Sequence, residues 1–214
     1  MLHFSAVRPP STLAILRTLM GIESLNHFFL VGGTALALHI GHRVSVDLDL
    51  FTQDEFYCGD ILEDLEKRFH YTIVKKQEKN LMMVYLSDPE FPDQPVKVDF
   101  LRYPAKIIDK VIHENNLRVL SLKDIIPMKL AAISGRGAKK DFYDIYHLLD
   151  FYSLSRMMDF FSEKYPNTAH FQVLKSLLYF TDAENDLDPI SLKNVFWNDV
   201  KDKIRIATND FLSS

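Results

Sequence analysis

The chain has 214 residues, of which 47% are hydrophobic, enough for one large domain or two small ones with buried cores. Its net charge of −4 excludes a protein that binds nucleic acid through overall positive charge, so such contacts depend on local patches such as Arg136, Lys139 and Lys140. Every apolar run is shorter than the roughly 18 to 20 residues of a membrane span, and the first residues lack a secretory signal pattern. Together with the single cysteine, Cys58, this favours a cytoplasmic protein without a membrane partner.

The N-terminal part of the chain switches repeatedly between helical and strand-like spacing of its apolar residues. Gly32 and Gly33 interrupt the pattern between a buried strand and a short helix. The elements expected in chain order are a helix from residue 11, a strand at 27–31, a helix at 34–39, a strand at 44–51, a helix at 60–69, and strands at 71–75, 81–86 and 96–101.

The chain becomes helical from about residue 119. Ser121 and Asp124 have the spacing of a capping box, and Pro127 marks either a kink or a second helix start. Helices are expected at residues 129–134 and 140–149, with several more between 153 and 211. We therefore predict an α+β fold, with a mixed sheet and flanking helices in residues 1–118 and a helical domain in residues 119–214.

Two acidic residues, Asp47 and Asp49, lie within the otherwise apolar strand expected at 44–51. Residues two apart in a strand point the same way, so both carboxylates project into one space. Buried carboxylates are costly without a cation, and hard divalent cations such as Mg²⁺ prefer oxygen ligands. Asp99, in the alternating segment 96–101, is a third ligand if the two strands are neighbours. The alternative is that all three are surface acids on the exposed faces of strands.

Gly32, Gly33 and Thr34 connect the buried strand to the short helix. Glycines let a phosphate approach the backbone, and a helix N-terminus offers unpaired N–H donors and a favourable dipole. Alone, the glycine pair is a tight turn, but followed closely by the aspartates it indicates a phosphate cradle beside a metal site. Arg43 is then a candidate phosphate contact. Ser45 either belongs to the site, on the face of the aspartates, or only hydrogen-bonds locally.

The runs GGTALAL and HRVSVDLDLF, the later KVDF and the segment KLAAISGRGAKKDFYDIYHLL resemble the AbiEii/AbiGii-type nucleotidyltransferase toxins. These belong to the DNA polymerase β-like nucleotidyltransferase superfamily, and the resemblance spans roughly residues 28 to 150. It implies a nucleotidyltransferase-like mixed sheet, a glycine motif at 32–34, and Asp47, Asp49 and Asp99 as catalytic Mg²⁺ ligands. It also implies an NTP substrate, an RNA acceptor such as a tRNA 3′ end, and a cognate antitoxin. In some related toxins the serine matching Ser45 is phosphorylated.

The same resemblance implies a second set of residues, Lys129, Arg136, Lys140, Asp141 and Asp144. Lys129 and Arg136 fall on one helical face, where a lysine meets a triphosphate as a point charge and an arginine binds it bidentately. Lys129 and Asp141 are the catalytic candidates of this set, and the others are nucleotide-binding candidates. The two aspartates flank the apolar stripe of the next helix and orient the basic residues or a substrate hydroxyl. The alternative is a set of salt bridges between neighbouring helices.

Three functions are compatible with these features. The first is a Mg²⁺-dependent nucleotidyltransferase that acts on RNA as the toxin of a toxin–antitoxin pair. The second has the same chemistry with a small-molecule acceptor. The third is a non-catalytic nucleotide-binding module, which the intact aspartates and Lys129 disfavour.

Overall fold

The chain divides into two compact units, which the computed structural model describes over residues 1–213. The sheet unit comprises Met1–Ala105 and Lys110–Ser121. The helical unit comprises Lys106–Asp109 and the chain from Leu122 onward. No helix within residues 1–213 is long and apolar enough to cross a membrane.

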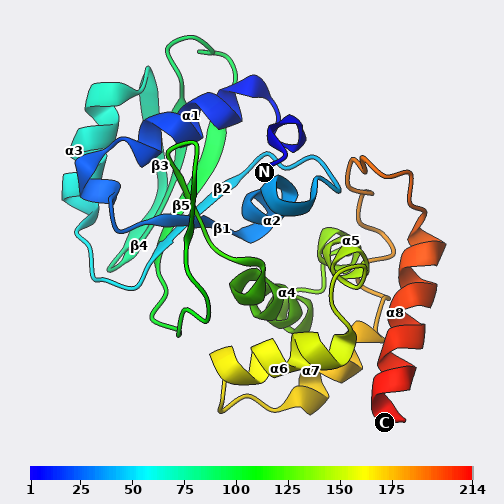
Figure 1. Cartoon of the computed structure of the whole chain (residues 1–214). Helices are drawn as coiled ribbons and strands as arrows, with labels where there is room; N and C mark the ends of the chain where they lie inside the picture. The colour runs from blue at the N-terminus through cyan, green and yellow to red at the C-terminus, as the bar shows by residue number, and fades with distance from the viewer. Residues whose placement is uncertain (214) are drawn as a thin grey trace. The chain divides into compact units, whose positions relative to one another are not determined.

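The sheet unit is built on seven strands: β1 (Phe29–Val31), β2 (Leu48–Thr52), β3 (Tyr71–Glu78), β4 (Leu81–Ser87), β5 (Val96–Arg102), β6 (Ile112–Glu114) and β7 (Leu117–Val119). They form one sheet in the order β3-β4-β5-β2-β1-β7-β6, and Figure 1 labels the strands β1 to β5 of this sheet. The β2–β5 and β1–β7 pairs are parallel, and the other pairs are antiparallel. This mixed sheet with flanking helices confirms the predicted α+β fold class.

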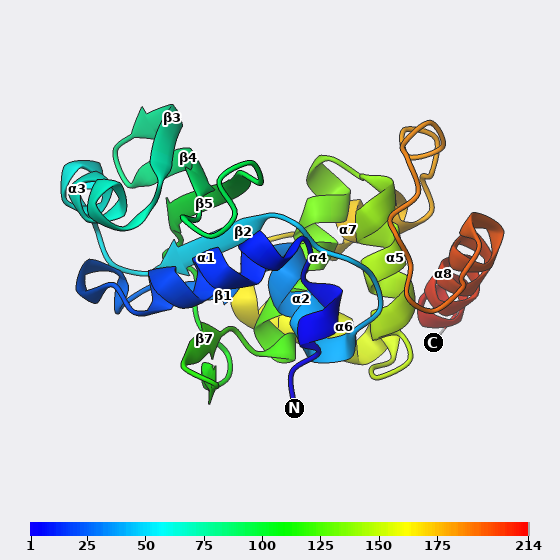
Figure 2. The ribbon, with the colours of Figure 1, turned by 90° about the horizontal axis from the view of Figure 1, so that it is seen from above.

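Three α-helices and two 3-10 helices flank this sheet: α1 (Pro10–Met20), α2 (Gly32–Ile40), α3 (Cys58–Arg68), η1 (Phe4–Ala6) and η2 (Glu23–Leu25). Helix α1 contacts β4 and β5, and α2 contacts β1 and β2. Figure 2 shows α3 beside β3, with β7 toward the opposite end of the sheet. The alternating side chains Val96, Val98 and Phe100 are buried, as the spacing in this strand predicts.

The prediction of a strand over residues 44–51 is wrong for its first half, because β2 begins only at Leu48. Strict alternation fails there, since Ser45 is buried whereas Val46 is 48% exposed. The backbone of this segment bonds to other elements instead: Ser45 N–H donates to the Ala6 carbonyl, and Arg8 N–H donates to the Ser45 carbonyl. Ser45 and Asp47 are therefore placed by an irregular segment that precedes the strand.

The helical unit contains five helices within the described residues: α4 (Leu122–Gly135), α5 (Lys139–Leu148), α6 (Leu154–Lys164), α7 (His170–Leu177) and α8 (Trp197–Leu212). Helix α4 continues through Pro127, which lies inside it, so Pro127 does not start a second helix. Apolar side chains such as Ile133, Phe142 and Phe161 are almost completely buried and form the core of this unit.

A buried ion pair joins the short segment Lys106–Asp109 to the rest of the helical unit. Lys164 Nζ lies 2.8 Å from Asp124 Oδ1 and donates a hydrogen bond to the Lys106 carbonyl. The Asp124 carboxylate also accepts hydrogen bonds from the backbone N–H groups of Ile108 and Asp109. These bonds compensate the cost of burying both charges, and they explain why this segment belongs to the helical unit.

Candidate active site

Asp49 and Asp99 are direct neighbours on the parallel strands β2 and β5, which lie side by side in Figure 1. Paired residues on adjacent strands point to the same face of a sheet. Leu48 and Phe100, which point to the opposite face, are buried in the core. Asp49 and Asp99 are only partly buried, so the two carboxylates emerge together on the face of the sheet that is accessible to solvent.

Gly32 brings the backbone of α2 against the carboxylate of Asp49. Its φ of +70° is in the left-handed region, and a Cβ atom at this position would lie 2.0 Å from Asp49 Oδ2. Because α2 begins at Gly32, this carboxylate lies at the N-terminus of the helix, where the dipole favours negative charge. The glycine thus lets the Asp49 carboxylate lie against the start of α2, and the phosphate cradle expected at residues 32–34 stays a prediction.

Gly33 serves a similar purpose for Arg43. A Cβ atom at residue 33 would lie 2.8 Å from Nη2 of Arg43, so the guanidinium group covers this glycine. Arg43 is 5% exposed, and its Nη1 donates a hydrogen bond to the Val44 carbonyl. In this conformation the arginine orders the segment before β2, and its contact with phosphate stays a prediction.

Thr34 and Ser45 form a buried hydrogen-bond chain that ends on the backbone of Asp47. The two hydroxyl oxygens are 2.9 Å apart, and the Thr34 hydroxyl donates to the Asp47 carbonyl. A hydroxyl has one proton, so in this chain Ser45 donates to Thr34. The first turn of α2 therefore fixes the backbone from which the Asp47 carboxylate projects, and Ser45 participates through this local bond.

Lys97, which the sequence analysis did not single out, lies among the three aspartates. Its Nζ is 2.5 Å from Asp99 Oδ2, and the other carboxylate oxygen of Asp99, Oδ1, is buried without a hydrogen-bond partner. Burial by itself would lower the pKa of Lys97, but the hydrogen bond to Asp99 and the charges of Asp99, Asp47 and Asp49 outweigh it and raise that pKa. The available signal was its position two residues before Asp99 in an alternating strand.

Within residues 1–213 no group of three or more histidine, cysteine, aspartate or glutamate side chains is arranged to hold a metal ion. The chemistry of the aspartates nevertheless fits a hard divalent cation, because carboxylate oxygens are its preferred ligands. Asp49 and Asp99 are paired across the strands, and the unpartnered Oδ1 of Asp99 is an acceptor that a cation would satisfy.

Four members of the second predicted set, Lys129, Arg136, Asp141 and Asp144, come together in the helical unit around Asp141. The guanidinium group of Arg136 binds this carboxylate bidentately, with Nε at 2.7 Å from Oδ2 and Nη2 at 2.9 Å from Oδ1. Lys129 Nζ lies 3.3 Å from Asp141 Oδ1 and 2.6 Å from Asp144 Oδ2. Both carboxylates are completely buried, and Lys129 is nearly so, whereas the Arg136 side chain is 58% exposed. The interhelical salt bridges considered as the alternative are therefore present.

The predicted basic patch of Arg136, Lys139 and Lys140 is wrong in one member. Lys139 is 6% exposed, and its ammonium group donates to the carbonyl oxygens of Glu184 and Asp186. It also lies 3.2 Å from a carboxylate oxygen of Asp188. Lys139 is thus an internal residue that holds the segment after α7, while Lys140 is exposed.

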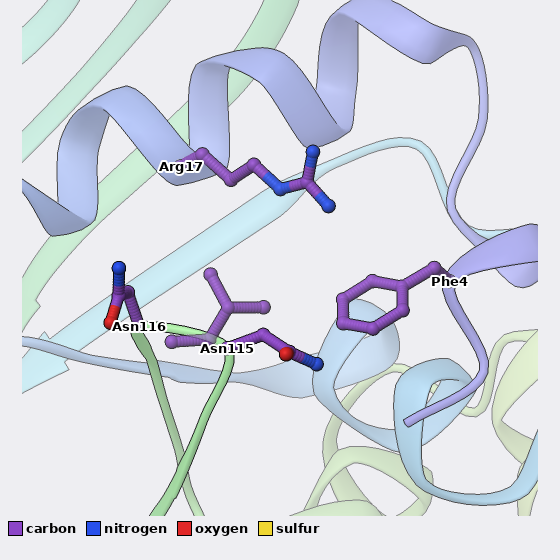
Figure 3. A pocket seen from close by; sticks show the side chains of 5 residues that line it. Phe4, Arg17, Asn115 and Asn116 are labelled. Atoms are coloured by element: carbon purple, nitrogen blue, oxygen red, sulfur yellow. The ribbon is translucent and has the colours of Figure 1, made fainter. Parts of the chain in front are cut away.

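A separate hollow of about 610 Å³ lies in the sheet unit and shares no residue with the aspartate cluster. Figure 3 shows Phe4 and Arg17 on one side and Asn115 and Asn116, from the turn between β6 and β7, on the other. The guanidinium carbon of Arg17 is 5.7 Å from the centre of the Phe4 ring. This hollow contains none of the residues that the sequence predicted.

The sequence profile of the family described as Nucleotidyl transferase AbiEii toxin, Type IV TA system, matches residues 14–211. The chain belongs to this family. The protein is accordingly a nucleotidyltransferase with a nucleotide substrate, and membership of a Type IV toxin–antitoxin family implies a cognate antitoxin.

The protein is similar over nearly its whole length to several known proteins. An uncharacterised protein of Aquifex aeolicus (strain VF5) is 29% identical over 209 residues, which cover 93% of this chain and 95% of that protein. A solved candidate nucleotidyltransferase of Helicobacter pylori is 20% identical with a TM-score of 0.61, covering 96% of this chain and 98% of its own. MenT4, a nucleotidyltransferase toxin of Mycobacterium tuberculosis, is 18% identical with a TM-score of 0.57, covering 92% and 82%. These solved structures share the fold.

Proposed function

We propose that the protein transfers a nucleoside monophosphate from an NTP to RNA, with the 3′ end of tRNA as the acceptor, and that it does so as a growth-inhibiting toxin. Mg²⁺ would be held by Asp47, Asp49 and Asp99. The observation that supports this best is the pairing of Asp49 with Asp99 across β2 and β5, with Asp49 against Gly32 at the start of α2. This arrangement collects oxygen ligands beside a helix N-terminus, which is a favourable place for phosphate groups.

The reaction forms a bond between the acceptor hydroxyl oxygen and the α-phosphorus of the NTP. The bond from that phosphorus to the oxygen bridging to the β-phosphate breaks, pyrophosphate leaves, and the hydroxyl proton passes to solvent. Divalent cations, when bound, neutralise charge on the attacking and leaving oxygens. The side chains of the protein position this chemistry: Asp49 and Asp99 are set by the sheet register, and Asp47 by the hydroxyl chain of Thr34 and Ser45.

In the helical unit, we assign phosphate contacts to Arg136 and Lys140, because both are exposed. Asp141 fixes the guanidinium plane of Arg136 with two hydrogen bonds, which prepares it for bidentate contact with phosphate oxygens. Lys129 and Asp144 are buried against each other. They support Arg136 from within, since Lys129 balances the charge of Asp141.

A transfer assay with purified protein tests this proposal. The protein would be incubated with each labelled NTP and Mg²⁺, first with total RNA and then with small-molecule acceptors. We expect label in tRNA with wild type and at least a hundredfold less with Asp49→Asn, whereas Arg17→Ala, outside the site, retains wild-type transfer. Label in small molecules alone would overturn the RNA acceptor and favour a small-molecule nucleotidyltransferase.

The toxin role is tested by induced expression in bacteria without an antitoxin. We expect wild type to slow growth and Asp49→Asn to relieve the effect at matched protein levels. Identical growth of the two strains would contradict the toxin role.

A further inference from the structure

The ammonium group of Lys97 occupies a place in the aspartate cluster where a cation is needed. Lys97 lies two residues before Asp99 on β5, so both side chains project from the same face of the strand. Its Nζ is 2.5 Å from Asp99 Oδ2, and it is close enough to Asp47 and Asp49 for their charges to act on it. A single lysine thus offsets part of the repulsion among three carboxylates.

A second pair in the same sheet shows why the surroundings of Lys97 matter. Lys76 and Glu78 on β3 have the same two-residue spacing, with 3.1 Å between Lys76 Nζ and Glu78 Oε1. Their side chains are 48% and 60% exposed, whereas those of Lys97 and Asp99 are 28% and 24% exposed. Water and salt screen the exposed pair, so its interaction is weak, while the partly buried pair is screened less.

We propose that Lys97 is a built-in counter-cation of this cluster, and that a divalent cation must displace its ammonium group from Asp99 in order to bind. This inference rests on the proposed metal role of the three aspartates. A Mg²⁺ ion binds carboxylate oxygens at about 2.0 to 2.1 Å. At such distances it would repel an ammonium group that shares the same carboxylate. Lys97 therefore lowers metal affinity and preserves the cluster when no metal is bound.

Metal binding to variants tests the competition directly. Metal-stripped wild type, Lys97→Met, Lys76→Met and Asp49→Asn would be titrated with Mn²⁺ alone, followed by calorimetry. We expect Lys97→Met to bind Mn²⁺ about tenfold or more tightly than wild type, because one positive charge is removed beside the ion. Lys76→Met, the matched control, should stay within about twofold of wild type. Without metal, Lys97→Met should also melt at a lower temperature than wild type, and Mn²⁺ should reverse that loss.

The outcomes separate this inference from the proposed function. If Asp49→Asn binds Mn²⁺ as wild type does, the aspartates are not the metal site, and both proposals fail. If Asp49→Asn loses binding but Lys97→Met binds no more tightly than wild type, the metal site stands and the counter-cation role of Lys97 is overturned.

A measurement on wild type keeps the inference testable even if Lys97→Met does not fold. Acetylation of lysines by a small acylating reagent would be followed by mass spectrometry with and without Mn²⁺. We expect Lys97 to react several-fold faster with Mn²⁺ present, because its ammonium group has left Asp99, while Lys76 reacts at the same rate in both. An unchanged or slower reaction of Lys97 at saturating Mn²⁺ would show that it is not displaced.

Discussion

The carboxylate of Asp49 and the α-carbon of Gly32 are so close that a methyl group on residue 32 would lie 2.0 Å from Oδ2. Gly32→Ala must therefore move either Asp49 or the start of α2, and it also places a Cβ atom on a residue with a φ of +70°. We expect a loss of about 2 kcal/mol or more in the free energy of unfolding, and nucleotide transfer reduced at least about tenfold.

Gly59 provides the matched control for Gly32. It lies in the first turn of α3, and a Cβ atom there would meet nothing within 4 Å. Gly59→Ala should leave transfer unchanged and raise stability by a few tenths of a kcal/mol up to about 1 kcal/mol. Urea unfolding of both variants measures the difference, and equal stabilities would contradict the close approach at Gly32.

Removing Lys129 should destabilise the helical unit much more than removing an exposed lysine does. Its ammonium group lies between the completely buried carboxylates of Asp141 and Asp144. Lys129→Met removes this cation and leaves an excess of negative charge in the core, which costs about 3 to 5 kcal/mol. Lys140→Met, at an exposed position, should change stability by less than about 0.5 kcal/mol. Chemical denaturation compares the two, and a stable Lys129→Met protein would contradict the buried network.

Replacing Arg118 by lysine should destabilise the protein even though the charge is kept. Its Nε, Nη1 and Nη2 donate hydrogen bonds to the carbonyl oxygens of Phe28, Met20 and Leu25, and burial lowers its pKa. A lysine keeps the charge but lacks the planar geometry that reaches three carbonyl groups at once. We expect Arg118→Lys to lower the free energy of unfolding by about 2 kcal/mol. Such a loss lowers the melting temperature by roughly 4 to 8 °C in a chain of this size, so a melting temperature within about 1 °C of wild type would contradict this expectation.

His39 should make the sheet unit less stable in mild acid. Burial lowers the pKa of His39, and this outweighs the opposing effect of its hydrogen bond with the Leu120 carbonyl. The unfolded state thus binds a proton at higher pH than the folded state does. This contribution to stability is complete above about pH 6.5 and is lost as the pH falls through the lowered pKa. The melting temperature of His39→Gln should therefore fall less than that of wild type between pH 7.5 and pH 5.5. An equal fall in both proteins would assign the acid sensitivity to other groups.

The alternation of apolar and polar residues predicted those strands of the sheet that have one buried face. The segment 96–101 alternates in sequence, and β5 has Val96, Val98 and Phe100 buried. Alternation misled at residues 44–47, because tertiary contacts to Ala6, Arg8 and Thr34 hold that backbone instead of a neighbouring strand. Such contacts join residues far apart in the sequence, so no local spacing reveals them.

The hairpin of β6 and β7 was missed, although the chain contains a signal for it. Asn115 and Asn116 both have positive φ angles, 51° and 62°, as a two-residue hairpin turn requires, and asparagine tolerates this conformation better than most residues. Each strand has only three residues, too few for alternation to be recognised.

In the aspartate cluster, the sequence made Asp99 a third ligand only if its strand lies beside the strand of Asp49, and the structure pairs these two residues on neighbouring strands. The role of Lys97 could not be predicted from the sequence, because its flexible side chain can reach more than one position and only the structure shows that it pairs with Asp99.

The bonds that attach Lys106–Asp109 to Asp124 and Lys164 determine where the chain can be cut into separate fragments. The chain leaves the sheet unit, contributes four residues to the helical unit, returns for the β6–β7 hairpin, and leaves again. A fragment that starts at residue 119 would include Asp124 and Lys164 but lack three backbone groups that bind them. A fragment that ends at residue 118 would carry Lys106–Asp109 without their partners and would cut β7 before its last residue. A single cut therefore cannot separate the two units without breaking these polar contacts.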